Sequence, residues 1–157
     1  MIDSMPRRKI VSQIFIVIFG LAGFILASSY NYLLFHTLAE GFSIVVAFSI
    51  FILTWKTRQF QENGYLEFLG IAYFFIAILD GVHTLAYKGM SSVFPGDDAN
   101  LATQLWIAAR YLESLSFLIA PILLKKQSHF TRLFWGVAVV TALLLVGFFM
   151  GLFPECF

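Results

Sequence analysis

Three pairs of ionisable side chains interrupt stretches of sequence that are otherwise apolar. They are His36 and Glu40, Asp80 and His83, and Arg110 and Glu113. Spacings of four, three and three residues bring the two members of each pair onto one face of an α-helix. Ionisable groups inside an apolar span are costly, so each requires a partner or a function. Carboxylates, imidazoles and a guanidinium that share a cavity can bind a ligand, hold an ion or exchange a proton.

Four of these residues are also of the types that bind metals. Zinc and related divalent ions accept imidazole and carboxylate ligands, and the sequence offers His36, Glu40, Asp80 and His83. A haem held by His36 and His83 is a further alternative. The spacing alone is not a metal-binding signature, so the sequence requires no cofactor. In a purely structural alternative, the same residues join the helices through hydrogen bonds and an ion pair of Arg110 with a carboxylate.

The segments that carry these residues are long and apolar. The chain has 157 residues, of which 60% are hydrophobic and only 12% are charged, against roughly 25% charged residues in soluble domains. Five stretches are long enough to cross a hydrocarbon layer of about 30 Å as helices, at about residues 10–28, 32–55, 65–87, 103–124 and 133–153. They do not alternate in polarity as barrel strands do. We therefore predict an all-α transmembrane bundle of about five spans, forming one integral membrane domain over residues 1–157.

The charges between the spans predict an orientation. Cytoplasmic loops are enriched in Lys and Arg, and a cytoplasmic N-terminus leaves only Lys88 outside. It places eight basic residues inside: Arg7, Arg8, Lys9, Lys56, Arg58, Lys125, Lys126 and Arg132. We expect the N-terminus in the cytoplasm.

With that orientation, all six ionisable residues fall in the outer half of the membrane. Counted from the outer span ends at about 1.5 Å per residue, their depths run from ~6 Å to ~15 Å. Polar residues are few in the inner halves of the same spans. This asymmetry favours a site open to the outside over the alternative of a small proton- or ion-coupled transporter, which needs a polar path through both halves. A haem- or metal-binding redox module is the third alternative.

Other classes of function have little support in the sequence. No HExxH, GxSxG or glycine-rich phosphate loop is present, so we expect no enzyme activity from this chain itself. A net charge of +1 gives no reason to expect nucleic acid as a partner. The single cysteine, Cys156, provides neither a disulfide framework nor a cysteine metal motif.

Three long strings of the sequence resemble the third class of bacterial membrane-associated sensor domains. They are YLLFHTLAEGFSIVVAFSIFILTW, YLEFLGIAYFFIAILDGVHTLAYKGM and LATQLWIAARYLESLSFLIAPILL, and the likeness runs from about Tyr32 to Lys125. The resemblance implies a multi-pass protein of the bacterial inner membrane that serves as the sensory input of a histidine kinase or a diguanylate cyclase. It therefore implies a role in two-component or cyclic di-GMP signalling. It assigns no ligand, so the signal stays an unknown small ligand or ion.

The resemblance also raises an expectation about the length of the chain. Such domains normally continue into further spans and a cytoplasmic output domain, whereas this sequence ends at Phe157. An odd number of spans would put that end outside the cell. We therefore expect a truncated protein rather than a stand-alone remnant, with any output enzyme on a missing C-terminal part. A homodimer is expected for the full-length protein because such output domains usually work as dimers.

Overall fold

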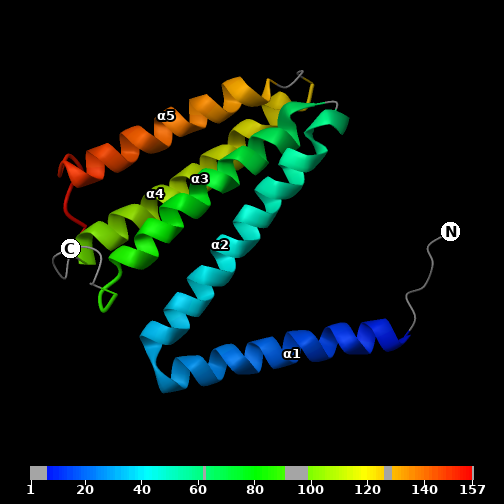
Figure 1. The fold of residues 1–157 in the computed structure, drawn as a ribbon. Helices are drawn as coiled ribbons and strands as arrows, with labels where there is room; N and C mark the ends of the chain where they lie inside the picture. The colour runs from blue at the N-terminus through cyan, green and yellow to red at the C-terminus, as the bar shows by residue number, and fades with distance from the viewer. Residues whose placement is uncertain (1–6, 62, 91–98, 126–128, 157) are drawn as a thin grey trace. The chain divides into compact units, whose positions relative to one another are not determined.

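The computed structural model describes residues 7–61, 63–90, 99–125 and 129–156, which leaves Lys126 outside the described residues. Five α-helices follow one another along the chain (Figure 1): α1 (Arg7–Tyr30), α2 (Tyr32–Thr57), α3 (Gly64–Ala86), α4 (Ala99–Ile119) and α5 (Phe130–Phe149). The described residues include no strand. All five helices are long and apolar enough to cross a membrane. The predicted all-α fold with five spanning helices is confirmed.

The chain divides into two compact units within α2. The first unit, Met1–Ala39, contains α1 and the first turns of α2. Asn31 begins α2, because its side-chain Oδ1 accepts hydrogen bonds from the backbone N–H groups of Leu33 at 2.8 Å and Leu34 at 3.2 Å. Such a cap satisfies donors that the first helical turn leaves without a partner. The rings of Phe24 and Phe35 meet edge to face at 6.1 Å and join α1 to α2 inside this unit.

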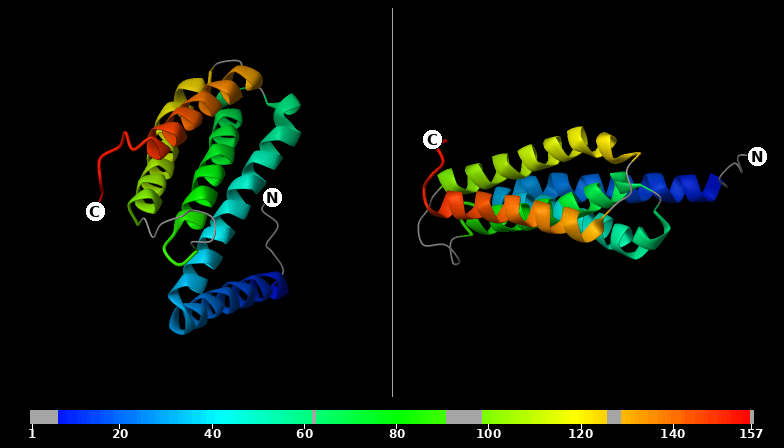
Figure 2. Two further views of the ribbon diagram at one scale, coloured as in Figure 1. Left: turned by 60° about the vertical axis from the view of Figure 1, so that its left-hand side comes forward. Right: turned by 90° about the horizontal axis from the view of Figure 1, so that it is seen from above.

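The second unit, Glu40–Phe157, is built around α3. Figures 1 and 2 show α3, α4 and α5 side by side. Ile71 and Leu79 of α3 and Leu105 of α4 are fully buried. One apolar cluster joins the second half of α3 to α4 and α5, and another joins the first half of α3 to α5 and the short 3₁₀ helix Ala120–Leu123. The central position of α3 explains why it is the most buried of the five helices.

The second half of α2 approaches α3 very closely at one point. A Cβ atom added at Gly70 of α3 would collide with the side chain of Thr54 of α2. Small residues at a helix interface permit this approach in membrane proteins. Nearby, the ring of Phe74 lies 4.6 Å from Phe51 and 5.8 Å from Phe134, measured between centroids. An aromatic layer thus joins α2, α3 and α5.

Local sequence signals set the ends of α4 and α5. Pro121 cannot donate a backbone hydrogen bond, and α4 gives way at Ala120 to the 3₁₀ helix. α5 ends at Phe149, earlier than the sequence-based bound near residue 153, because Gly151 adopts a positive φ of 67°. The N–H of Leu152 donates to the Gly147 carbonyl and the N–H of Gly151 to the Phe148 carbonyl, both at 3.0 Å. These are the two bonds of a Schellman cap, which a left-handed glycine favours.

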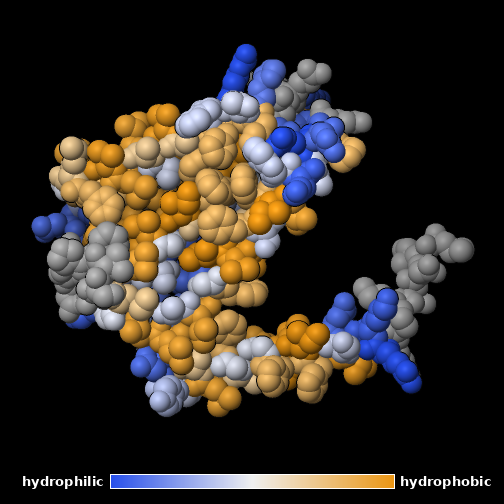
Figure 3. All heavy atoms as spheres, viewed as in Figure 1, coloured by the Kyte–Doolittle hydropathy of each residue, from blue (hydrophilic) through white to orange (hydrophobic). Residues whose placement is uncertain are grey.

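The surface of the second unit suits lipid as its solvent. Hydrophobic residues cover most of the visible face of this unit, and many of the hydrophilic residues gather near the helix ends (Figure 3). Large apolar side chains such as Leu118 and Leu143 are about 70% exposed. An exposed apolar area of this extent is unusual for a soluble protein and is expected in a bilayer.

Candidate functional site

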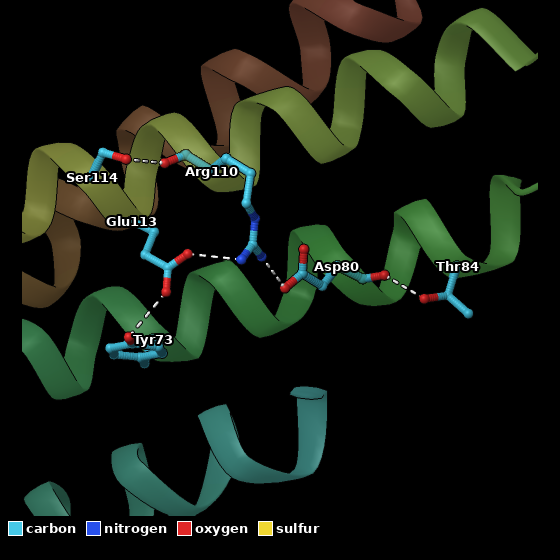
Figure 4. Close-up of polar contacts among 6 residues, drawn as sticks. All are labelled: Tyr73, Asp80, Thr84, Arg110, Glu113 and Ser114. Atoms are coloured by element: carbon cyan, nitrogen blue, oxygen red, sulfur yellow. Dashed lines mark hydrogen bonds and ion pairs between the residues drawn. The ribbon is translucent and has the colours of Figure 1, made fainter. Parts of the chain in front are cut away.

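An ionic network links the second half of α3 to the middle of α4 (Figure 4). The guanidinium of Arg110 donates from Nη2 to Oδ2 of Asp80 at 2.6 Å and from Nη1 to Oε2 of Glu113 at 2.7 Å. Arg110 and Glu113 lie one turn apart on α4, as their spacing predicts, whereas Asp80 comes from α3. One guanidinium therefore bridges two carboxylates from two helices.

Tyr73 extends this network and is not among the six residues selected from the sequence. Its hydroxyl donates to Oε1 of Glu113 at 3.0 Å. Tyr73 precedes Asp80 by seven residues, or two helical turns, so both share one face of α3. That spacing could have identified it. Because 18% of the residues in this chain are aromatic, a tyrosine within an apolar run is not distinctive by itself.

His83 lies one turn beyond Asp80 and is held by a backbone group. Its Nδ1 lies 2.7 Å from the carbonyl oxygen of Ala102 in α4, and the side chain is buried. A carbonyl oxygen only accepts hydrogen bonds, so Nδ1 carries the hydrogen. In the neutral ring, Nε2 is then the basic nitrogen. The fold therefore fixes both the tautomer and the ring orientation of His83.

Glu40 is the residue of α2 that lies at the same site. A carboxylate oxygen of Glu40 and a ring nitrogen of His83 lie within 4.8 Å of each other. Glu40 also interacts electrostatically with Asp80 and Arg110. We call the residues gathered here the polar cluster: Glu40, Tyr73, Asp80, His83, Arg110 and Glu113. Five of the six residues selected from the sequence belong to it.

The remaining selected residue, His36, lies in the other unit. His36 is on α2 in the first unit, where its ring lies 6.5 Å from that of Tyr32. His36 is therefore described with the first unit and is not counted in the polar cluster of the second unit. A haem between His36 and His83 stays a prediction.

The charges of the polar cluster do not balance. Glu40, Asp80 and Glu113 contribute three negative charges and Arg110 one positive charge, so the fixed charges sum to −2. Asp80 is only 1% exposed, and its Oδ1 accepts no hydrogen bond within the described part of the chain. Burying charge is expensive unless it is paired. The cluster is thus arranged to attract a cation, a proton or a hydrogen-bond donor.

An apolar groove of this unit lies apart from the polar cluster and has a different chemistry. This groove of about 390 Å³ runs between α4 and α5 and is lined almost entirely by apolar atoms, with Ala108, Leu144 and Phe148 among its residues. No member of the polar cluster lines it. We therefore place the candidate functional site at the polar cluster, where the titratable groups converge.

The fold and this cluster together define an all-α membrane protein with an ionisable centre inside its helical bundle. Residues 27–157 match the family model of the MASE3 membrane-associated sensor domain, and the chain belongs to this family. The match includes α2 to α5 and hence every residue of the polar cluster. The match confirms the family that the sequence resemblance indicated. No curated protein and no solved structure is similar enough to the chain to count as a match.

Proposed function

We propose that this chain is the sensory input module of a bacterial signalling protein and that the polar cluster receives the signal. The proposal places the module in the inner membrane with its N-terminus in the cytoplasm. A histidine kinase or diguanylate cyclase domain on the same polypeptide would supply the enzyme activity. The membership of a sensor family and the resemblance of the three sequence strings support this proposal.

One observation carries the choice of site. Arg110 bridges Asp80 and Glu113 across α3 and α4, two helices that are also joined by a cluster of buried apolar residues. Replacing a buried ion pair by well-packed apolar side chains is often neutral or stabilising. Stability alone therefore gives little reason to place three carboxylates here, whereas the detection of an ion, a proton or a polar ligand does.

The mechanism follows from the two helices that the network joins. A signal that binds the cluster changes the charge balance around Arg110 and hence the contact between α3 and α4. A ligand shifts such an equilibrium only by as much as it prefers one packing to the other. The ends of the helices near Trp55 and Phe130 would then move and pass the change to the output domain, which we expect to be dimeric.

The test uses a longer member of the family that carries the same residues ahead of an output enzyme. We expect the equivalent of Arg110→Gln to lock the output at one level, because the bridge between α3 and α4 is lost. The matched control is Ser114→Ala on the same helix, since the hydroxyl of Ser114 donates to the backbone carbonyl of Arg110 at 2.8 Å and leaves its guanidinium unaltered. Normal regulation in the Arg110→Gln, Asp80→Asn and Glu113→Gln proteins alike would refute the proposal.

Ion-coupled transport is the competing function, and flux measurements separate it from sensing. In proteoliposomes of the purified chain, we expect no flux of protons or metal ions above that of empty vesicles. A flux that Asp80→Asn abolishes would favour transport.

A further inference from the structure

The positions of Glu40 and His83 suit a shared metal ion. They come from α2 and α3 of the same unit, and their ligand atoms lie within 4.8 Å of each other. Zinc binds imidazole nitrogen and carboxylate oxygen at about 2.0–2.2 Å, so two such ligands of one tetrahedral ion stand about 3.4 Å apart. The separation in the structure allows an ion to bind with small side-chain movements.

The surroundings of His83 match those of a metal-binding imidazole. Histidine ligands usually donate their second ring N–H to a carboxylate or a backbone carbonyl, which fixes the tautomer and orients the ring. In this chain the Ala102 carbonyl accepts from Nδ1 of His83 at 2.7 Å. Nε2 is therefore the nitrogen that would bind the ion.

The charge balance selects a divalent cation. The cluster's fixed charges sum to −2, from three carboxylates and Arg110, and one divalent ion brings the sum to zero. Asp80 supplies independent support, because this residue is 1% exposed and its Oδ1 has no hydrogen-bond partner within the described residues. A water bound to a metal ion is a strong hydrogen-bond donor and would satisfy such an oxygen.

We propose that Glu40 and His83 bind a divalent transition-metal ion of the zinc type, with water completing its coordination. Imidazole and carboxylate together suit zinc and its neighbours better than magnesium or calcium, which prefer oxygen ligands alone. Two protein ligands make an exchangeable site rather than a closed structural one. The proposal rests on the sensory function above and names its signal as the concentration of such an ion.

The experiment measures Zn²⁺ and Co²⁺ binding to the purified full chain in detergent after treatment with a chelator. We expect one Zn²⁺ per chain by elemental analysis. We also expect a visible Co²⁺ absorption band that Zn²⁺ displaces. Glu40→Gln and His83→Gln should each weaken binding by about 100-fold, because removal of a ligand costs at least as much as the 10–100-fold that loss of an outer-shell partner costs.

Two matched variants test whether any weakening is specific. Glu67→Gln alters another buried carboxylate of α3, and His129→Gln alters the histidine that precedes α5. Both should bind Zn²⁺ as the native chain does. Helical content measured by circular dichroism must stay native in every variant, and Glu40→Gln provides the test if His83→Gln fails to fold.

Zn²⁺ that does not bind the native chain, or that binds equally to the native, Glu40→Gln and His83→Gln chains, would overturn the metal proposal. Neither result would decide the sensory role of the cluster. That role is tested separately through the output of proteins altered at Arg110, which is not a proposed ligand. A regulated output that needs Arg110 but ignores Zn²⁺ would refute the metal and retain the sensor.

Discussion

The two halves of α3 contact their neighbouring helices through side chains of different chemistry. Toward its beginning, α3 meets α2 at Gly70 and Thr54 and surrounds Phe74 with aromatic rings. Toward its end, α3 adds the Asp80–Arg110 ion pair to its apolar contacts with α4. Van der Waals packing of small and apolar residues is sufficient to hold helices together in lipid. An ion pair is therefore not required to hold α3 against α4, and we attribute the presence of the Asp80–Arg110 pair to sensing.

The largest effect is expected from removal of the positive charge of Arg110 at the contact between α3 and α4. Arg110→Gln leaves the buried Asp80 carboxylate without its counter-charge. We expect a decrease in unfolding free energy of about 3 kcal/mol, near the lower end for broken buried pairs because the Arg110 side chain is 37% exposed. Denaturant unfolding in detergent, followed by circular dichroism, measures this change.

The double variant Asp80→Asn with Arg110→Gln sharpens this result. It removes both charges, so it should recover part of the stability that Arg110→Gln loses. If the two losses simply add, the ion pair makes no energetic contribution and the contrast between the two halves of α3 disappears.

An intermediate effect is expected at the close contact of the apolar half. Gly70→Ala inserts a methyl group against Thr54 and should destabilise the protein by about 2 kcal/mol, as overpacking commonly does. Gly81→Ala is the matched control on the same helix, because a Cβ there meets no atom within 4 Å. Thermal unfolding of the two variants side by side provides the comparison, and equal stability would mean that α2 and α3 do not approach as described.

The smallest effect is expected at the edge of the ionic network. Tyr73→Phe removes the hydroxyl that donates to Glu113 at 3.0 Å and should cost about 1–2 kcal/mol, as for one hydrogen bond to a charged group. Tyr111→Phe alters an exposed tyrosine on α4 and should leave stability unchanged. A Tyr73→Phe protein as stable as this control would remove Tyr73 from the network.

Much of this arrangement is predictable from the sequence, and the rest depends on which helices are neighbours. Hydropathy identifies the five helices, and spacing places Arg110 beside Glu113 on one helical face. Neither signal indicates that Thr54 lies against Gly70, because periodicity describes a face but not its partner. The spacing of Tyr73 from Asp80 places it on the right face of α3, but its hydrogen bond with Glu113 depends on which helix lies opposite. The early end of α5 was readable from Gly151, a common C-terminal cap.

The central claim is that the state of the polar cluster controls packing at the far ends of the helices. The most direct test measures the distance between spin labels at Lys56→Cys and Lys125→Cys in a Cys156→Ser background. Both positions are exposed: Lys56 lies in the last turn of α2, and Lys125 follows the 3₁₀ helix Ala120–Leu123. We predict two distance populations by pulsed electron paramagnetic resonance, and we expect their ratio to change in Arg110→Gln and to stay constant in Gly81→Ala. A single distribution that is identical in all three proteins would contradict the claim.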